Sequence, residues 1–285
     1  MELSMAAWVV SNSAGSMSDR EVSRFIDHVK FQTGINLDIS KRYLLESRLR
    51  PVLEKFSLDS YGELLRCVVD VNSSENQALI SAITTNETYF FRDEHPFDLL
   101  KYKLIPDILG EEQNAVVKIA SAACSSGQEA YSMAMVLKEV LFDLTKYRVQ
   151  IGAFDISDEI ITLASKGEYS KFEVERGLSD DKIRSYFDCV NGRYQVKAEL
   201  RSIVSFSKKN LLRPEGCIKK FNIVFCRNVV NYFEDKDRAL LFDNLANMLL
   251  PKGVLVIGAT EFLNNQFGRF VKKSEKGSVY YEKVG

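Results

Sequence analysis

Histidine is scarce in this chain of 285 residues, which contains only His28 and His95, far apart in the sequence. This supply is poor for a histidine-based catalytic triad and for a metal centre, which commonly uses imidazole ligands. The five cysteines are scattered and include no Cys-x-x-Cys pair: Cys67, Cys124, Cys189, Cys217 and Cys226. An odd, scattered set is typical of reduced thiols in a cytosolic protein. We therefore expect a cytoplasmic protein with no metal site.

Long apolar runs and an excess of positive charge are also missing. No apolar run approaches the roughly 18 residues of a membrane span, so we expect no insertion into a membrane. The stretch Ala6–Val10 is too short, with too little basic charge before it, to be a signal peptide. The 38 Lys and Arg residues against 39 Asp and Glu residues give a formal net charge of −1, which argues against a nucleic-acid partner. The 46% of hydrophobic residues can form a sizeable core.

The first part of the chain predicts a small all-α domain. Residues 1–17 are rich in Ser, Ala and Met, and we expect them to be a loose lead-in. Helical periodicity follows a Ser18-x-x-Glu21 capping box, in which the two side chains satisfy each other's backbone N–H groups. No strand signal of comparable strength appears over residues 18–83, so we expect this range to be a helical domain.

Further helices are expected within this domain. Ser40 is the expected cap of the second helix, and Pro51 should kink or divide that helix because proline lacks an N–H donor. Two short helices are expected at Ser60–Val69 and Glu75–Ile83.

Charge is divided unevenly along the chain. Residues 1–100 carry 10 basic and 15 acidic residues, whereas residues 101–285 carry 28 and 24. One segment of the acidic part is nevertheless basic, through Lys41, Arg42, Arg48, Arg50 and Lys55. Lys41, Arg48 and Lys55 are seven residues apart, so an unbroken helix would place them on one side. This side is either a solvated face or a docking face for an acidic partner.

The second part of the chain alternates between apolar strands and helices. The expected strands are Val116–Ala123, Arg148–Asp155, Phe221–Cys226 and Val254–Ala259. The expected helices are Gln128–Phe142, Glu159–Lys166 and Lys236–Leu250. This alternation predicts an α/β fold, a doubly wound and mostly parallel sheet covered on both faces.

Two antiparallel features accompany the expected sheet. Phe270–Lys273 and Val279–Lys283 flank Gly277 and predict a hairpin. Arg193–Val196 and Ile203–Phe206 alternate in hydropathy, and we expect them to form a small antiparallel insertion at about residues 186–207.

A ligand site is predicted where the first two strands end. The loop Ser121–Glu129 is rich in small residues, which let backbone amides approach a ligand closely, but it lacks the G-x-G-x-x-G and phosphate-loop patterns. Asp155 ends the second strand, where a carboxylate can bind ribose hydroxyls or simply cap the next helix. Together the loop and the acid favour a nucleoside-bearing ligand at the carboxyl ends of the strands.

Four segments together resemble the CheR-type chemoreceptor glutamate methyltransferases. Thr84–Arg92 resembles that family's T-T-N-x-T-x-F-F-R, and Cys124–Ser132 resembles its C-S-x-G-x-E-x-Y-S. Asp155–Ser157 and Phe225–Phe233 resemble its D-I-S and F-C-R-N-V-x-x-Y-F motifs. The resemblance runs in order from about Asp19 to the C-terminus. It implies a Rossmann-like methyltransferase domain at 101–285, joined to the helical domain by a linker at 84–100 that contributes to the active site.

The resemblance also implies a cofactor and its contacts. The family binds S-adenosylmethionine and releases S-adenosylhomocysteine, with no metal. Carried over position by position, the expected cofactor contacts are Asn86, Thr88, Arg92, Glu129, Asp155, Asn210, Leu211, Arg227 and Asn228. Glu129 and Asp155 could accept from hydroxyls or from an ammonium group.

The implied reaction needs no general base. The resemblance implies methylation of glutamates on the cytoplasmic helical domain of chemoreceptors, and a glutamate carboxylate, with a pKa of about 4.3, is already ionised at neutral pH. It places Arg92 and Tyr232 as catalytic residues beside the transferred methyl group, where Arg92 could hold the carboxylate. The basic residues from Lys41 to Lys55 would dock the receptor, the small insertion could bind a receptor tail, and we expect a monomer.

The chain departs from the family pattern at a few positions. Gln128 and Ala130 replace Glu and Pro, Gly258–Glu261 reads G-A-T-E where the family has G-H-S-E, and Pro51 lies in the basic helix. None of these changes removes an expected cofactor carboxylate. The alternative function is a signalling scaffold or sensor that binds S-adenosylmethionine without turnover, but the presence of Arg92 and Tyr232 favours the enzyme.

Overall fold

The chain divides into two compact units. A computed structural model describes residues 15–111, 116–214, 220–263, 268–275 and 277–285. One unit comprises the chain up to Gln32 together with Leu37–Ile83, and the other comprises Thr33–Asn36 and Thr84–Gly285. Most of the expected lead-in, residues 1–14, lies outside the described residues, as do Cys217 and Lys276. Within residues 15–17, Met17 is buried in the first unit rather than loose.

The first unit consists of helices, as expected. Its elements are α1 (Asp19–Thr33, whose last residue belongs to the second unit), the 3₁₀ turn η1 (Ile39–Lys41), α2 (Arg42–Lys55), α3 (Tyr61–Cys67) and α4 (Ser74–Ile83). The capping box of α1 is confirmed, because Ser18 N–H donates to Glu21 (2.8 Å) and Glu21 N–H donates to the Ser18 hydroxyl (3.3 Å). Apolar faces of these helices meet in a core whose fully buried members include Phe25, Leu49 and Leu79.

Two expectations for α2, a division at Pro51 and a cap by Ser40, were wrong. The helix is not divided at Pro51 but runs through it to Lys55. Leu49, Val52 and Leu53 around the proline are all buried, so packing outweighs the lost backbone hydrogen bond. Ser40 does not cap α2 either. The Asp38 carboxylate accepts from Ser40 N–H (2.8 Å) and begins η1, which leads into α2.

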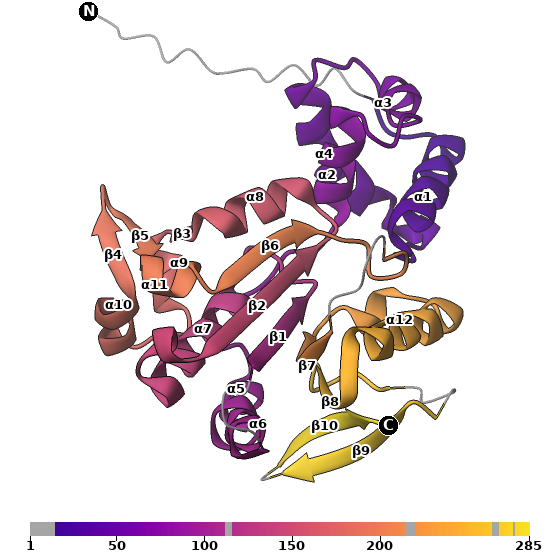
Figure 1. The fold of residues 1–285 in the computed structure, drawn as a ribbon. Coiled ribbons are helices and arrows are strands. Elements are labelled where there is room, and N and C mark those ends of the chain that lie inside the picture. The colour runs from indigo at the N-terminus through magenta and orange to yellow at the C-terminus, as the bar shows by residue number, and fades with distance from the viewer. Residues whose placement is uncertain (1–14, 112–115, 215–219, 264–267, 276) are drawn as a thin grey trace, which may run out of the picture. The chain divides into compact units, whose positions relative to one another are not determined.

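The second unit is built on a seven-stranded sheet with the order β6-β2-β1-β7-β8-β10-β9 (Figure 1). The strands are β1 (Val116–Ala122), β2 (Arg148–Asp155), β6 (Val204–Lys208), β7 (Phe221–Cys226), β8 (Leu249–Ile257), β9 (Phe270–Glu275) and β10 (Ser278–Lys283). Strands β6, β2, β1, β7 and β8 are parallel, and β9 and β10 form the expected antiparallel hairpin. The doubly wound α/β fold is therefore confirmed.

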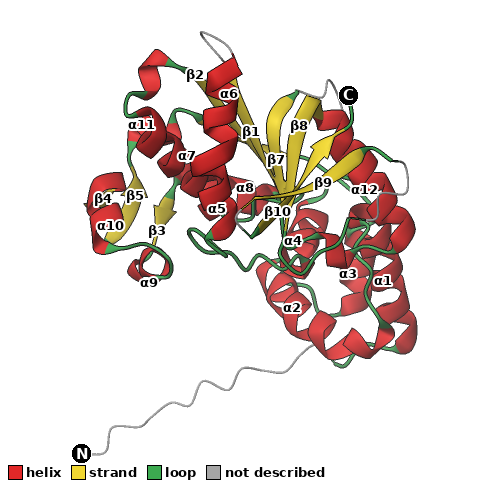
Figure 2. Cartoon of the chain, turned by 90° about the horizontal axis from the view of Figure 1, so that it is seen from below, coloured by secondary structure: helices red, strands yellow, loops and turns green. Residues whose placement is uncertain are grey.

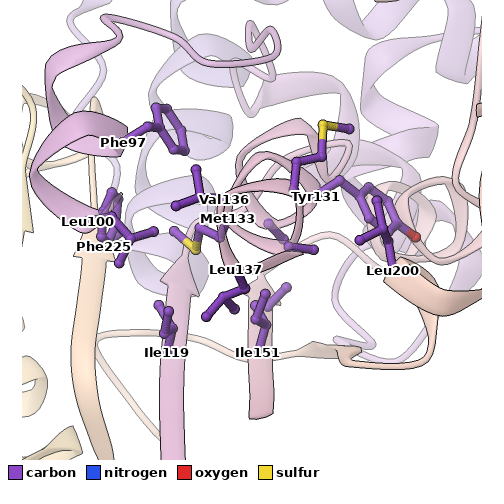
Figure 3. Packing of buried hydrophobic residues seen from close by; sticks show 14 of the residues in the cluster. Phe97, Leu100, Ile119, Tyr131, Met133, Val136, Leu137, Ile151, Leu200 and Phe225 are labelled. Atoms are coloured by element: carbon purple, nitrogen blue, oxygen red, sulfur yellow. The ribbon is translucent and has the colours of Figure 1, made fainter. Parts of the chain in front are cut away.

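Helices cover both faces of this sheet (Figure 2). They are α5 (His95–Leu99), the π-helical turn η2 (Leu100–Leu104), α6 (Ile105–Glu111), α7 (Gln128–Leu141), the 3₁₀ turn η3 (Leu144–Lys146), α8 (Asp158–Lys166), the 3₁₀ turn η4 (Val230–Tyr232) and α12 (Asp235–Met248). Alternate residues of β7 enter two separate cores, Ile223 and Phe225 with α7, and Val224 and Cys226 with α12. Figure 3 shows the first core, where Phe97, Met133 and Phe225 lie among the packed side chains. Part of the expected linker is helical, since α5 begins at His95.

A three-stranded insert, residues 168–196, forms a second sheet with the order β3-β5-β4. Its elements are β3 (Glu168–Tyr169), α9 (Lys171–Glu175), α10 (Asp180–Tyr186), β4 (Phe187–Val190) and β5 (Arg193–Val196), and α11 (Ala198–Arg201) follows it. The expectation that Ile203–Phe206 belongs to this insertion was wrong, because β6 pairs in parallel with β2. β6 is an edge strand of the main sheet and is half exposed, so its hydropathy alternates as it would in a separate hairpin. None of the helices in the described ranges combines the length and the apolar run needed to cross a bilayer.

The continuity of α2 yields a stability prediction. Pro51 is exposed and lies in the interior of the helix, where proline destabilises the folded state by about 3 kcal/mol. The rigidity of proline also lowers the entropy of the unfolded chain, which stabilises the folded state by only about 1 kcal/mol. We expect Pro51→Ala to raise the free energy of unfolding of the helical unit by about 2 kcal/mol, measured by urea denaturation. Glu54→Ala, at an exposed position of the same helix, is the control and should change little. A lower stability for Pro51→Ala would contradict this account.

Candidate active site

A pocket lies at the carboxyl ends of β1, β2 and β7. It encloses about 940 Å³ of empty space, part of which is open to solvent. Its wall comes from the segment 84–92, the loop after β1, the end of β2, residues 209–211 after β6 and residues 227–233 after β7, with Thr33 and Ile35. The chain passes from β1 to β2 on one side and reaches β7 on the other, so the pocket occupies the point where strand order reverses. Such switch points are where doubly wound sheets bind ligands.

The structure brings all of the expected cofactor contacts and Tyr232 into this one pocket. The expected residues that line it are Asn86, Thr88, Arg92, Glu129, Asp155, Asn210, Leu211, Arg227, Asn228 and Tyr232. They come from five separate stretches of the chain, so their assembly depends on the topology of the sheet.

The expected docking residues lie on the helical unit instead. Lys41, Arg50 and Lys55 are exposed. Arg42 forms an ion pair with Asp19, and Arg48 donates to the Ile83 carbonyl, so these two side chains also make contacts within their own unit. Arg50 also forms a hydrogen bond with Tyr61, and Lys55 Nζ lies 5.7 Å from the centroid of the Phe56 ring, so exposed members of the segment have contacts within the unit as well.

The loop after β1 is held in a strained backbone conformation by its neighbours. Ala123, Ser125 and Gly127 have φ values of 63°, 51° and 94°, in the left-handed region that favours glycine. Ser125 N–H donates to Asp155 Oδ2 (2.9 Å), and the Ser125 hydroxyl donates to the Asn86 carbonyl (2.9 Å). The loop is thereby fastened both to the end of β2 and to the segment 84–92.

Asp155 is almost fully buried at the end of β2. Its burial raises the pKa of the carboxyl group, and hydrogen bonds from the backbone N–H groups of Ser157, Ser125 and Ile156 oppose that rise. Each oxygen already accepts one backbone N–H, from Ser125 on Oδ2 and from Ser157 on Oδ1 (3.2 Å). Because a carboxylate offers about four acceptor sites, Asp155 can still accept from ligand hydroxyls.

Arg227 is buried and connects two stretches of the chain that line the pocket. Its side chain is 2% exposed and donates to Glu129 (2.9 Å), to the Asp93 carboxylate (2.7 Å) and to the Arg92 carbonyl (2.7 Å). Its Nε is buried and has no acceptor among the described residues. Its other contacts show that Arg227 holds Glu129 and the segment after Arg92 in place.

Glu129 is the second carboxylate of the pocket. It stands in the first turn of α7, accepts the Ser121 hydroxyl (2.7 Å) on Oε1 and accepts Arg227 on Oε2. Two of its roughly four acceptor sites are used, and the others can accept from donors of a ligand. The two carboxylates therefore suit a ligand that carries hydroxyl or ammonium donors.

Cys124, in the same loop, also lines the pocket. Burial, and then the negative charges of Asp155 and Glu129, raise the pKa of this thiol well above its usual value. Neither the metal-binding nor the disulfide chemistry of cysteine is evident around it, because Cys67, Cys124, Cys189 and Cys226 are free thiols. Across the described ranges, no group of three or more His, Cys, Asp or Glu side chains could hold a metal ion.

Glu261 supports the loops beside the pocket, a role that was not assigned from the sequence. Its carboxylate is buried and accepts the backbone N–H groups of Gly258 (2.7 Å), Asn228 (2.8 Å) and Val230 (2.7 Å). Asn228 has a φ of 59°, so these bonds stabilise a conformation that its backbone rarely adopts. The G-A-T-E stretch after β8 was the available signal, because an acid just beyond a buried strand often binds neighbouring N–H groups.

The pocket has an apolar part beside its polar groups. Ile35, Leu211, Val229 and Phe233 line it, whereas its amide and hydroxyl groups come from the segment 84–92 and from other loops, among them Asn210 and Asn228. An apolar wall suits a flat base, and the carboxylates suit ribose hydroxyls and an amino-acid ammonium group. The residues present therefore fit S-adenosylmethionine, and the fold and the pocket define a Rossmann-like methyltransferase.

Comparison with known proteins shows the family. Residues 86–278 match "CheR methyltransferase, SAM binding domain", and residues 20–84 match "CheR methyltransferase, all-alpha domain". The chain is 40% identical to chemotaxis protein methyltransferase 1 of Pseudomonas aeruginosa over 81% of this chain and 86% of that protein. It is 38% identical to chemotaxis protein methyltransferase 1 of Vibrio cholerae over 94% of this chain and 98% of that protein. The chain therefore belongs to the CheR methyltransferase family and is an S-adenosylmethionine-dependent methyltransferase.

The role of Glu261 can be tested by a change of one atom. In Glu261→Gln, an amide NH₂ replaces one acceptor oxygen and leaves at least one buried N–H unpaired, which costs about 1–3 kcal/mol. We expect a lower free energy of unfolding and weaker binding of S-adenosylhomocysteine, measured by denaturation and calorimetry. Thr260→Ala, at the exposed neighbouring position, should leave both quantities unchanged. Wild-type affinity in Glu261→Gln would show that Glu261 does not position the loop.

Proposed function

We propose that this protein methylates glutamate side chains on the cytoplasmic helical domain of chemoreceptors. The products would be glutamate methyl esters and S-adenosylhomocysteine. The observation that carries the proposal is the convergence of Arg92 and Tyr232 on the pocket that also holds the expected cofactor contacts. The relatives are named chemotaxis protein methyltransferases, which supports a chemotaxis substrate.

The reaction places few demands on the protein. Bound S-adenosylmethionine supplies an electrophilic methyl group on a sulfonium. The acceptor carboxylate is ionised at neutral pH, so no side chain has to remove a proton. Neither His28 nor His95 lines the pocket, in keeping with this requirement. The protein contributes by orienting the carboxylate and excluding water, which can lower the barrier by several kcal/mol.

Arg92 is suited to hold the acceptor carboxylate. Its Nη1 donates to the Glu87 carbonyl (2.7 Å), and the residue lines the pocket. A guanidinium can bind a carboxylate through two parallel hydrogen bonds, which fixes the direction of the attacking oxygen.

Tyr232 is suited to orient the same acceptor carboxylate. Its backbone carbonyl accepts Asn36 N–H (2.9 Å), its own N–H donates to the Val229 carbonyl (3.1 Å), and its side chain is 38% exposed. The backbone is thus fixed while the ring remains accessible to a substrate. Its hydroxyl can donate to an incoming carboxylate.

We further propose that the basic segment of α2 docks the acidic methylation helix of the receptor. Lys41, Arg50 and Lys55 are the exposed members and would make the contacts. Arg42 and Arg48 also contribute to the positive potential, although each contacts its own unit. Such charge complementarity would chiefly accelerate association and would weaken at high salt.

The test is transfer of labelled methyl from S-adenosylmethionine to cytoplasmic fragments of several receptors, followed by mild alkali. A carboxyl methyl ester releases the label in base, whereas label that stays on the protein would contradict the proposal. Absence of transfer despite tight binding of S-adenosylhomocysteine would indicate a sensor or scaffold instead.

In this assay, Arg92→Ala should lower kcat by about a hundredfold, because an unoriented carboxylate loses the advantage of its position. The fold should persist, which circular dichroism would check. Arg184→Ala is the matched control, since Arg184 is 69% exposed and pairs with Asp181 on α10. Normal turnover of Arg92→Ala would remove Arg92 from the proposed mechanism.

The raised pKa of Asp155 predicts a pH dependence of cofactor binding. Hydroxyl donors of a ligand favour the charged carboxylate, so the pKa of Asp155 should be lower in the complex than in the free protein. Affinity should therefore be full above the free-protein pKa, which lies above 3.8, and should fall as the pH drops through it.

Calorimetry with S-adenosylhomocysteine at a series of acidic pH values measures this effect. Asp155→Asn should bind about tenfold more weakly at neutral pH and lose part of the dependence, because an amide cannot titrate. Asp188→Asn, at an exposed position of β4, should keep the wild-type profile. An unaltered profile in Asp155→Asn would assign the dependence to another group.

A further inference from the structure

The turn Arg176–Gly177, which follows α9 in the three-stranded insert, contacts the pocket segment 84–92. Arg176 Nη2 lies 2.9 Å from Glu87 Oε1. The guanidinium carbon of Arg176 is 4.6 Å from the centroid of the Tyr89 ring, within the range of a cation–π contact. One side chain of the insert therefore holds two residues of the segment.

Gly177 brings the two backbones together at the same place. Its φ is 124°, and a Cβ at this position would lie 2.1 Å from the Phe90 carbonyl oxygen. Phe90 is fully buried, and its ring packs edge-on against Tyr169 of β3 (5.0 Å) and Phe187 of β4 (5.5 Å). The segment is thus fixed to the insert by its backbone and by a buried aromatic side chain.

The two residues that Arg176 contacts are also those that hold Arg92. Arg92 Nη1 donates to the backbone carbonyl of Glu87 (2.7 Å), and its guanidinium carbon is 5.9 Å from the Tyr89 ring centroid. Arg176 and Arg92 consequently share Glu87 and Tyr89 as neighbours. A change in the position of either shared residue changes the support of Arg92.

We propose that Arg176 is a positioning residue for methyl transfer and acts through Glu87 and Tyr89 on Arg92. The insert thereby fixes the orientation of the guanidinium that faces the acceptor carboxylate. This inference rests on the proposed role of Arg92. The Arg176–Glu87 pair is largely exposed, at 43% and 64%, so it adds little to stability, and its effect is on orientation.

The first test separates positioning from folding. Arg176→Ala should lower kcat for labelled methyl transfer by about tenfold, while the affinity for S-adenosylhomocysteine and the Tm stay unchanged. Arg176→Lys keeps a cation beside Glu87 and Tyr89 and should restore most of the rate. Lys171→Ala is the matched control, because it removes the exposed Lys171–Glu175 pair (3.6 Å) of the preceding helix α9 and should have no effect.

A double-mutant cycle tests whether Arg176 acts through Arg92. In single-turnover measurements, Arg176→Ala should cause no further loss in the Arg92→Ala background. An equal loss in both backgrounds, or normal turnover of Arg176→Ala while Arg92→Ala is slow, would overturn the inference and leave the proposed function standing. Normal turnover of Arg92→Ala would instead refute the proposed role of Arg92 itself.

Discussion

The buried guanidinium of Arg227 is the contact on which the pocket depends. It pairs with Glu129 in the first turn of α7 and with Asp93, and it binds the carbonyl of Arg92, so it ties the end of β7 to two other stretches of the chain. A buried charge is tolerated only when it is paired, and loss of both carboxylates would leave this one uncompensated. The arrangement therefore stabilises one geometry of the pocket wall much more than it stabilises the fold.

Two buried carboxylates fix the neighbouring loops. Asp155 binds the loop after β1, and Glu261 binds three N–H groups of the loops after β7 and β8. The loops after β1 and β7 contain left-handed residues, which would be strained without these acceptors. The pocket is thus pre-organised by acids, and catalysis by positioning alone, as proposed for an ionised acceptor, requires such rigidity.

The strongly apolar strands and the capping box could be predicted from the sequence because their signals are local. The edge strand β6 could not, since half of it is exposed and its pattern matches a free hairpin. For the site, the residues alone indicated Asp155, the loop Ser121–Glu129 and the charged end of the strand at Arg227, and the other contacts came from the resemblance. The partners of Arg227 lie 98 and 134 positions away, and no local pattern specifies pairs at such separation. The contact of Arg176 with Glu87 could not be predicted from the sequence for the same reason.

Cys124 lines the pocket whose residues fit an alkylating cofactor. Only a thiolate is a strong nucleophile, and burial beside Asp155 and Glu129 keeps this thiol protonated by raising its pKa. The carboxylates that suit the cofactor's donors therefore also disfavour a nucleophilic thiolate in the same pocket.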